Sequence, residues 1–552
     1  MPRGSTIYYK GYVTNDAGTI LSAERSFSNV PVFTGTGTWA SAANWTNSAV
    51  PGAGASNGDA SVLDSPIING TCTLASDITC TNLTINPSKR LYIAPQHSLT
   101  VNGTLVKDSD TLSLVIKSDT IGTGSLMHNT NNIAATVQRY VTGSATLTLK
   151  KYHLVSVPIT GDASGNYESW VWLHSFLFTY TPLTDTWFPW DYPTNHTLST
   201  HVGAMVYYTY PSKVYSIAGT LNNGSYSPTI SAAGNGYNLI PNPYPSAINW
   251  NAASGWTKTN IGSTIWGFSA TAGNYGSWNG STGTNSVTNI IPVGQAFFVI
   301  ASGSPVLTMN NSVRLNNNTQ AFLKSATAST NILHLVAAGN GGQDEIALQF
   351  AADATNSSAD KYDAIKFYGT MSMPQLSSYT ASDANLLSIS GLPAIQSSSV
   401  VPLRFNMDFT GEVVFTANGV GTFNETSIQL EDKQLTQMID LNSNPVYTFY
   451  HTPTDALDRF VLHFSSIQTG IAKPGAASLS KVTTSGNEIY LHYPSASSGK
   501  LMATVYDLQG RVISQVKLSG TGNDHISIRT SGAYLVKLNL SSGVETHKIV
   551  VL

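Results

Sequence analysis

The chain of 552 residues contains little charge and little cysteine, and it has no long apolar run. Asp, Glu, Lys and Arg make up 10% of it, against roughly 25% in an average soluble protein. The formal net charge of −3 argues against nucleic-acid binding, because phosphate contacts need clustered Lys and Arg. The most apolar run, from Ala296 to Ala301, stops at Ser302-Gly303, so the sequence predicts no membrane span.

The two cysteines, Cys72 and Cys80, are separated by strand-like residues. In an exported protein they could form a disulfide, whereas two buried thiols that act as small hydrophobic side chains would look the same in sequence. Both alternatives stay open at this point.

Ser, Thr, Asn and Gly take the place of the missing charge, and 41% of the residues are hydrophobic, so the composition is not that of a disordered chain. Apolar and polar residues alternate along most segments, and Gly, Asn and Pro bound these segments. The pattern predicts an all-β, multi-domain protein with strands of roughly four to seven residues and almost no helix.

The last part of the chain shows this alternation most clearly. Strand-like segments include Glu488–Tyr493, Leu501–Asp507 and Thr546–Val551, and Gly-containing turns separate them. The pattern predicts a small antiparallel, Ig-like sandwich of about seven strands, with Thr546–Leu552 as its last strand and Lys548 exposed.

Three stretches of this region, Val505–Ile513, Ser531–Leu538 and His547–Leu552, resemble the type-A C-terminal sorting domain of the type IX secretion system of Bacteroidetes. The resemblance implies export through an outer-membrane translocon and processing by a sortase-like peptidase. It also implies a final location in the medium or on the outer cell surface. The residues that carry this export signal would be Tyr506, Asp507, Gly510, Gly532, Tyr534 and Lys548.

The other end of the chain is predicted to contain a piece of a further module. Residues 1–30 combine a cloning remnant with strands joined by the turn Asn15–Gly18. These strands resemble the last strands of a truncated fibronectin type III or Ig-like module.

Residues 31–140 have a different repeat. Gly37–Trp45 resembles the opening of solenoid-like modules in Bacteroidetes surface proteins, and the pairs Leu83/Ile85, Leu91/Ile93 and Leu99/Val101 follow at a spacing of eight. One strand and one turn per eight residues suit a three-sided β-solenoid, although a meander of hairpins fits the same spacing. The resemblance favours the solenoid.

Two further modules are predicted before the end. Residues 141–318 form an aromatic-rich β module, residues 319–468 form a β-sandwich, and both resemble β-rich modules that precede sorting domains. The Gly/Pro/Ala-rich stretch from Gln468 to Leu479 is the predicted linker at the start of the segment 469–552.

Catalytic motifs are weak, and we predict that the chain is not an enzyme and has no catalytic residue. The string Gly54-Ala55-Ser56-Asn57-Gly58 matches G-x-S-x-G, but a nucleophile on this motif needs a strand-to-helix turn, and no helix pattern follows. Acidic and amide residues cluster once and could hold a structural calcium ion, or could simply be solvated: Asp353, Asn356, Asp360 and Asp363. No other cofactor is expected.

Aromatic residues suggest a ligand site. Trp266, Tyr275, Trp278 and Asn279 lie in or beside the Gly/Ser/Asn-rich run Ala270–Thr288, which is expected to be a loop. Exposed rings with amide neighbours could stack on sugars, whereas the alternative is that these rings fill a β core.

Together these features predict an adhesin-like, surface-exposed region of a large modular protein. The alternative is a carbohydrate-binding accessory region of a secreted glycan-degrading enzyme. Expected partners are the type IX translocon and the sortase-like peptidase, with glycans or another cell-surface ligand as candidates.

Overall fold

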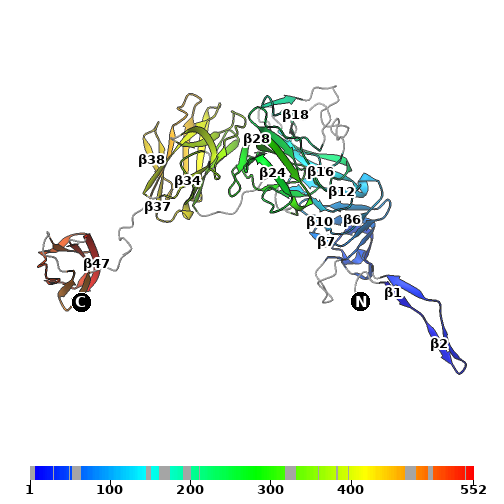
Figure 1. Ribbon diagram of the computed structural model, residues 1–552, viewed down its shortest axis with the longest axis horizontal. Coiled ribbons are helices and arrows are strands. Elements are labelled where there is room, and N and C mark those ends of the chain that lie inside the picture. The colour runs from blue at the N-terminus through cyan, green and yellow to red at the C-terminus, as the bar shows by residue number, and fades with distance from the viewer. Residues whose placement is uncertain are drawn as a thin grey trace. The chain divides into compact units, whose positions relative to one another are not determined.

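A computed structural model of the chain (Figure 1) describes residues 6–28, 30–48, 50–52, 64–144, 151–160, 175–189, 200–209, 212–316, 331–358, 360–380, 383–395, 397–466, 480–494, 501–540 and 543–551. Strands dominate these residues, their helical elements are 3-10 turns of three residues, and none of their helices is long and apolar enough to cross a membrane. The all-β prediction is confirmed. The predicted range of strand lengths is too narrow, since β11 (Leu105–Val106) has 2 residues and β28 (Ala296–Met309) has 14.

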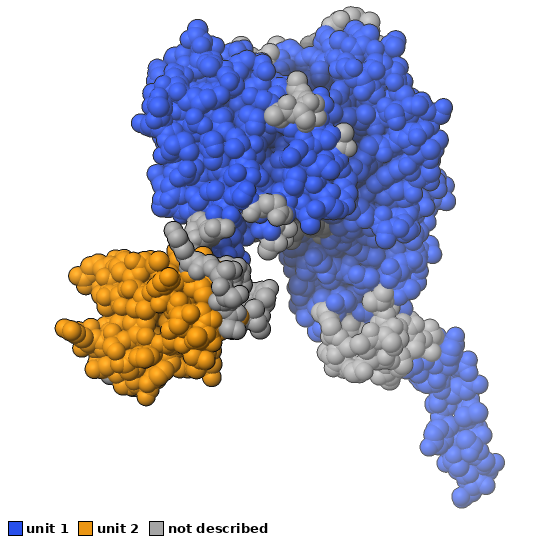
Figure 2. Space-filling view, turned by 60° about the vertical axis from the view of Figure 1, so that its left-hand side comes forward, with its two compact units in different colours: residues 1–466 blue, residues 467–552 orange. Residues whose placement is uncertain are grey.

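The chain divides into two compact units, residues 1–466 and 467–552 (Figure 2). Each unit has its own hydrophobic core. Residues 1–5, where a cloning remnant is expected, the string Gly54–Gly58, the whole predicted linker Gln468–Leu479 and the last residue, Leu552, are outside the described residues.

The first unit begins with a ribbon of paired strands. The expected turn Asn15–Gly18 joins two of them, and the Asn15 side chain accepts a hydrogen bond from the Ala17 N–H at 2.9 Å. The strands are β1 (Thr6–Tyr9), β2 (Tyr12–Asn15), β3 (Gly18–Leu21) and β4 (Arg25–Ser28).

Parallel pairing defines the next module as a solenoid. Its strands are β5 (Val32–Thr38), β6 (Ile67–Leu74), β7 (Ile78–Cys80), β8 (Leu83–Ile85), β9 (Arg90–Ile93), β10 (Ser98–Val101), β11 (Leu105–Val106), β12 (Leu114–Ile116), β13 (Ser118–Asp119), β14 (Gly122–Thr123), β15 (Ser125–Met127) and β16 (Ala134–Thr142). One side stacks β6, β9, β12 and β16, and another stacks β7, β10 and β15. A meander of hairpins needs antiparallel neighbours, so the parallel pairing of these strands excludes it and supports the solenoid.

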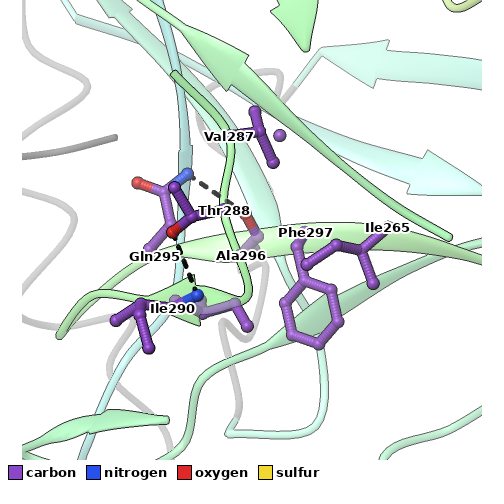
Figure 3. A pocket seen from close by; sticks show the side chains of 9 residues that line it. Ile265, Val287, Thr288, Ile290, Gln295, Ala296 and Phe297 are labelled. Atoms are coloured by element: carbon purple, nitrogen blue, oxygen red, sulfur yellow. Dashed lines mark hydrogen bonds between the residues drawn. The ribbon is translucent and has the colours of Figure 1, made fainter. Parts of the chain in front are cut away.

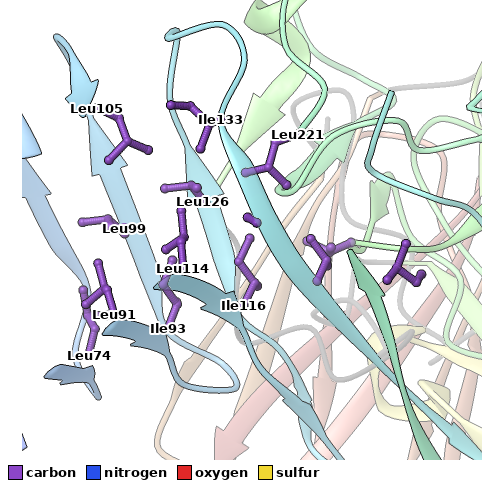
Figure 4. Packing of buried hydrophobic residues seen from close by; sticks show 14 of the residues in the cluster. Leu74, Leu91, Ile93, Leu99, Leu105, Leu114, Ile116, Leu126, Ile133 and Leu221 are labelled. Atoms are coloured by element: carbon purple, nitrogen blue, oxygen red, sulfur yellow. The ribbon is translucent and has the colours of Figure 1, made fainter. Parts of the chain in front are cut away.

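Stacked rungs bury a continuous apolar column. Leu91 lies between Cys72 and Leu114 in register, and Leu99 lies between Ile78 and Leu126. Figure 4 shows the labelled Leu and Ile side chains gathered inside the stack, and Leu91, Leu99, Leu114 and Leu126 are fully buried. Each rung therefore covers the apolar face of its neighbour, which no rung could bury alone.

Cys72 and Cys80 are free thiols in this column, which corrects the candidate disulfide. Both are fully buried, Cys72 on β6 and Cys80 on β7. Burial raises the pKa of each thiol to about 12, because a thiolate would lose its hydration. The two thiols act as small hydrophobic side chains.

The aromatic-rich part contains two cores around the long strand β28. Its other strands are β17 (Tyr152–Val155), β18 (Ser175–Thr181), β19 (Thr186–Pro189), β20 (Ala204–Tyr208), β21 (Ser212–Thr220), β22 (Tyr237–Pro241), β23 (Ala247–Asn249), β24 (Trp256–Ile261), β25 (Ile265–Ser269), β26 (Asn274–Trp278), β27 (Ile290–Ile291) and β29 (Arg314–Leu315). β21 pairs antiparallel with β16, so this part continues the last sheet of the solenoid. Phe297 and Phe298 of β28 are both buried, and they belong to the two different cores.

The remaining strands of the first unit form one sheet that curls around a Phe-rich core. They are β30 (Ile332–Gly339), β31 (Gly342–Ala351), β32 (Ala364–Ile365), β33 (Gln375–Thr380), β34 (Asp383–Pro393), β35 (Ser398–Asn406), β36 (Gly411–Asn418), β37 (Thr426–Asp432), β38 (Gln437–Asp440), β39 (Val446–His451) and β40 (Phe460–Ser466). A buried ion pair holds β37 to the start of β40, since the Arg459 Nη2 lies 2.6 Å from the Asp432 Oδ2. The pair lies beside the rings of Phe449 and Phe460.

The second unit is the predicted sandwich. One sheet has the order β41-β42-β45 and the other β44-β43-β46-β47, all antiparallel. The strands are β41 (Lys481–Ser485), β42 (Glu488–His492), β43 (Met502–Tyr506), β44 (Val512–Lys517), β45 (Asn523–Ser527), β46 (Gly532–Leu540) and β47 (Gly543–Val551). Alternate residues such as Ile489, Leu491, Val505 and Val536 fill the space between the sheets.

Candidate functional site

The last described strand, β47, is the main candidate, because it is the edge strand of its sheet. Ile549 and Val551 are buried, whereas Lys548 and Val550 are exposed. The predicted alternation of this strand and the exposure of Lys548 are therefore confirmed.

The backbone edge of β47 is less open than expected. The Thr484 hydroxyl of β41 donates a hydrogen bond to the Val550 carbonyl at 2.9 Å. Ser480, just before β41, also contacts the side chains of Glu545 and His547. A partner that adds a strand at this edge would have to displace these side chains.

The outer face of the same sheet brings two predicted signal residues together, the half-buried Tyr506 and the exposed Lys548. Lys548 pairs with Leu535 of β46, and Leu535 pairs with Tyr506 of β43. Their neighbours Ile549, Val536 and Val505 point into the core, so these three side chains lie outside in one cross-strand row. We call Tyr506, Leu535 and Lys548 the outer row. Leu535 escaped the sequence analysis because only the register between strands reveals it.

Asp507 and Gly510 build the turn between β43 and β44. The Asp507 carboxylate accepts hydrogen bonds from the N–H groups of Gln509 and Arg511, and the Arg511 Nε lies 2.7 Å from its Oδ2. Burial acts to raise the pKa of Asp507, but the hydrogen bonds from Arg511 outweigh burial and lower it. Gly510 has φ of +79°, a left-handed conformation that favours glycine.

Tyr534 is buried and anchors the start of β46. Its hydroxyl donates to the Thr530 carbonyl at 2.8 Å, the arrangement of a tyrosine corner in Ig-like sandwiches. Gly532 lies in the same turn region and at the start of β46. The described contacts of Asp507 and Tyr534 thus support the fold, and Lys548 is the exposed charge among the predicted signal residues.

The sugar-stacking hypothesis needed exposed rings, and this expectation is wrong. Trp266 is 2% exposed and Trp278 is 7% exposed. The expected loop Ala270–Thr288 contains β26, which pairs with β25 as a hairpin. The Trp266 indole N–H donates to the Ile365 carbonyl at 2.8 Å, and its ring stacks on Phe367 with centroids 4.7 Å apart.

Tyr275 and Asn279 are engaged at the same place. The Tyr275 ring packs edge-on against Phe268 with centroids 5.0 Å apart. The Asn279 side chain donates to the Tyr362 carbonyl at 2.6 Å. The hairpin is covered by residues of the following sheet, and its aromatic and amide groups are used in that packing.

The cavity beside this hairpin is too small for a sugar. It holds about 10 Å³, and Figure 3 shows Ile265, Val287 and Phe297 among the residues that line it. That volume corresponds to one water molecule, whereas pockets for small-molecule ligands are on the order of 300 Å³ or more.

The carboxylates of the acidic cluster accept hydrogen bonds from backbone N–H groups of their own loop and of β34. The Asp360 carboxylate accepts from the Thr355 and Tyr362 N–H groups, and the Asp363 carboxylate accepts from the Asp360 and Gly391 N–H groups. Asp353 pairs with Lys361 and the Tyr362 hydroxyl at the surface, and Asn356 lies in the same loop. Within the described ranges, no group of three or more His, Cys, Asp and Glu is placed to hold a metal ion. The calcium site stays a hypothesis with no geometric support.

Two family models match the chain. A family described as a domain of unknown function, DUF8693, matches residues 32–464. The model of the secretion system C-terminal sorting domain matches residues 485–552. No curated protein matches the chain.

Solved structures show only distant likeness. A β-glucuronidase from Ruminococcus gnavus is 9% identical with a TM-score of 0.11, and the match covers 26% of this chain and 36% of the enzyme chain. The BSP domain of a biofilm associated protein is also 9% identical with a TM-score of 0.11, over 76% of this chain and 63% of that one. The chain thus spans about a third of the glucuronidase, and TM-scores this low support no inference.

Proposed function

The chain belongs to the DUF8693 family of unknown function and also carries a secretion system C-terminal sorting domain, and from this premise we propose that it is an adhesin-like surface protein. The sorting domain identifies a substrate of type IX secretion, which is secreted or held at the outer cell surface. In our proposal the solenoid and sheet modules of residues 32–464 serve as a non-enzymatic, surface-exposed scaffold, as in Bacteroidetes proteins of this kind.

The observation that carries the export part of this proposal is the outer row. Tyr506, Leu535 and Lys548 come from three strands, yet strand register aligns them on the outer face of the sheet. An exposed cation beside apolar surface suits recognition by a protein partner, because charge supplies selectivity and apolar area supplies affinity. We propose that the type IX machinery, including the sortase-like peptidase, recognises this face more than the flanked edge of β47.

A reporter fusion tests export. Residues 478–552 are fused behind a folded reporter with an ordinary signal peptide, in a bacterium with a type IX system. Because this segment contains a complete core, we expect the reporter at the cell surface or in the medium. Deletion of the last five residues removes the buried Ile549 and Val551 and should leave the reporter in the periplasm. An intact fusion that stays periplasmic while the host exports its own cargo would refute the proposal.

A matched pair of charge reversals tests the outer row. Lys548→Glu should sharply reduce export, whereas Lys517→Glu on β44 of the same sheet should not. Both lysines are exposed, so neither change should alter the free energy of unfolding by more than about 0.5 kcal/mol. Equal export of the two variants would show that the type IX machinery does not recognise the outer row.

The carbohydrate-binding alternative cannot rely on Trp266 and Trp278 for sugar stacking, since both rings are buried. A glycan-array measurement on the intact chain separates the two proposals. Retention of a defined glycan would favour the accessory region of a glycan-degrading enzyme, and adhesion to cells without glycan retention would favour the adhesin-like scaffold.

A further inference from the structure

A lysine and an aspartate meet inside the first unit with no exposure to solvent. The Lys366 Nζ, just after β32, lies 2.5 Å from the Asp344 Oδ2 on β31, and both side chains are 0% exposed. A second pair in the same part of the chain, Lys361 and Asp353, lies 2.6 Å apart, but its side chains are 66% and 61% exposed. The two pairs have the same chemistry and differ in burial.

The two carboxylate oxygens of Asp344 accept hydrogen bonds from different groups. Oδ1 accepts hydrogen bonds from the Asn285 Nδ2 and the Glu345 N–H, each at 2.9 Å. Oδ2 faces the Lys366 amine and accepts from the Leu376 N–H at 2.6 Å. The Glu345 side chain in turn holds Asn285 by accepting its backbone N–H. Oδ1 therefore faces two neutral N–H donors, and Oδ2 faces the Lys366 amine and one backbone N–H.

Burial changes the chemistry of this pair. Desolvation raises the pKa of Asp344 above its ordinary value, although its bonds to Lys366 oppose the shift. In a medium that solvates ions poorly, transfer of one proton from the ammonium to the carboxylate produces a neutral amine and a carboxylic acid. An amine is a nucleophile only in this neutral form, and the carbon that it would attack belongs to the acid beside it.

The geometry points to a covalent bond, and we propose that Lys366 and Asp344 condense to an intramolecular amide. The Nζ lone pair attacks Cγ of the protonated Asp344 carboxyl group, and negative charge develops on Oδ1 between the Asn285 and Glu345 donors. The Cγ–Oδ2 bond then breaks. Oδ2 leaves as water with its own hydrogen and one hydrogen from the nitrogen, which keeps a single hydrogen. No oxidant or other reactant is needed.

Two features favour the product. The amine and the acid are held in contact, so the reaction is effectively unimolecular. Both side chains are closed to solvent, which removes the water needed for hydrolysis. The bond would tie β31 to the segment after β32 and close the acidic loop between them. Such a link would protect this part of a protein that works outside the cell, and it does not depend on the proposed adhesin-like function.

Mass spectrometry of the purified, denatured chain tests the proposal. The wild-type mass should be lower than the sequence mass by one water molecule, and trypsin should release a branched peptide that contains both Asp344 and Lys366. Lys361 and Asp353 provide the internal control, because their exposed pair should stay linear. Asn285→Ala removes one donor to Oδ1 and should lower the linked fraction.

Lys366→Arg keeps the positive charge but should have the full sequence mass, and Asp344→Ala should also have it. The decisive readout is the mass and the branched peptide of the wild-type chain, so poor folding of a variant does not hide the result. A wild-type chain at full mass, with trypsin cleaving after Lys366, would overturn the proposal. Loss of water that persists in Lys366→Arg would overturn it as well.

Discussion

Replacement of Trp278 by Ala decides between the core and ligand roles of this ring. Trp278 is 7% exposed and packs in a core with Ile265, Val287 and Phe297. A buried Trp removes roughly 150–250 Å² from water, which at about 25 cal/mol per Å² corresponds to about 4–6 kcal/mol of transfer free energy. Measured Trp-to-Ala changes in cores cost about 3–5 kcal/mol, and we expect a loss of stability in this range.

Native-state hydrogen exchange is the suitable assay, because a unit of this size need not unfold in one step. Protection factors of the amides in β25, β26 and the first half of β28 should fall by several orders of magnitude, whereas those of the second unit should not change. Phe176→Ala is the control. This ring is 43% exposed and stacks on Tyr207 with centroids 4.6 Å apart, so the loss should be only about 1 kcal/mol.

A loss below about 1 kcal/mol for Trp278→Ala, together with loss of retention on a glycan column, would refute this reasoning. It would place the ring in solvent and restore the sugar-stacking hypothesis.

Other predictions follow from buried groups. Asp432→Ala should destabilise the first unit by about 3–5 kcal/mol in hydrogen exchange, because it leaves the Arg459 guanidinium buried without this partner. Burial acts to raise the pKa of Asp432, but its bonds to Arg459 and Tyr447 outweigh burial and lower it. Its contribution to stability is therefore complete above the unfolded pKa of about 4 and is lost as pH falls through the lower folded pKa, which acid titration of unfolding would show. Cys72 and Cys80, whose thiols have pKa values of about 12, should react with a thiol reagent at pH ~8 only after unfolding; fast labelling of the native chain would contradict this. Leu91→Ala should lower the free energy of unfolding by about 2–5 kcal/mol and reduce amide protection in the two adjacent rungs. Unchanged stability and protection would contradict the stacked core.

Local pattern determined the strand content and the strands of the sorting sandwich. Segments such as Glu488–Tyr493 alternate between core and solvent, and this period of two does not depend on what packs above them. The exposure of Lys548 follows from the same alternation. The turn Asn15–Gly18 was equally readable, because its backbone conformation is set by its own residues.

The eight-residue spacing in the solenoid left two alternatives, since one strand and one turn look the same in both. Pairing of Leu91 with Leu114 and of Leu99 with Leu126 decided the matter. These partners are separated by whole rungs, and the hydrophobic pattern of one rung carries no information on the direction of its neighbour.

Only the tertiary structure determined which polar side chains are buried. The run Ala270–Thr288 has the composition of an exposed loop, yet Asn274 and Asn279 are buried and donate hydrogen bonds to the carbonyls of Gln343 and Tyr362. No local pattern marks Asp344 of β31 as buried, yet its side chain lies beside Lys366 with no exposure. A polar side chain can be buried wherever partners satisfy it, and those partners are distant in sequence. Composition therefore identifies polar residues but cannot tell which of them the folded chain encloses.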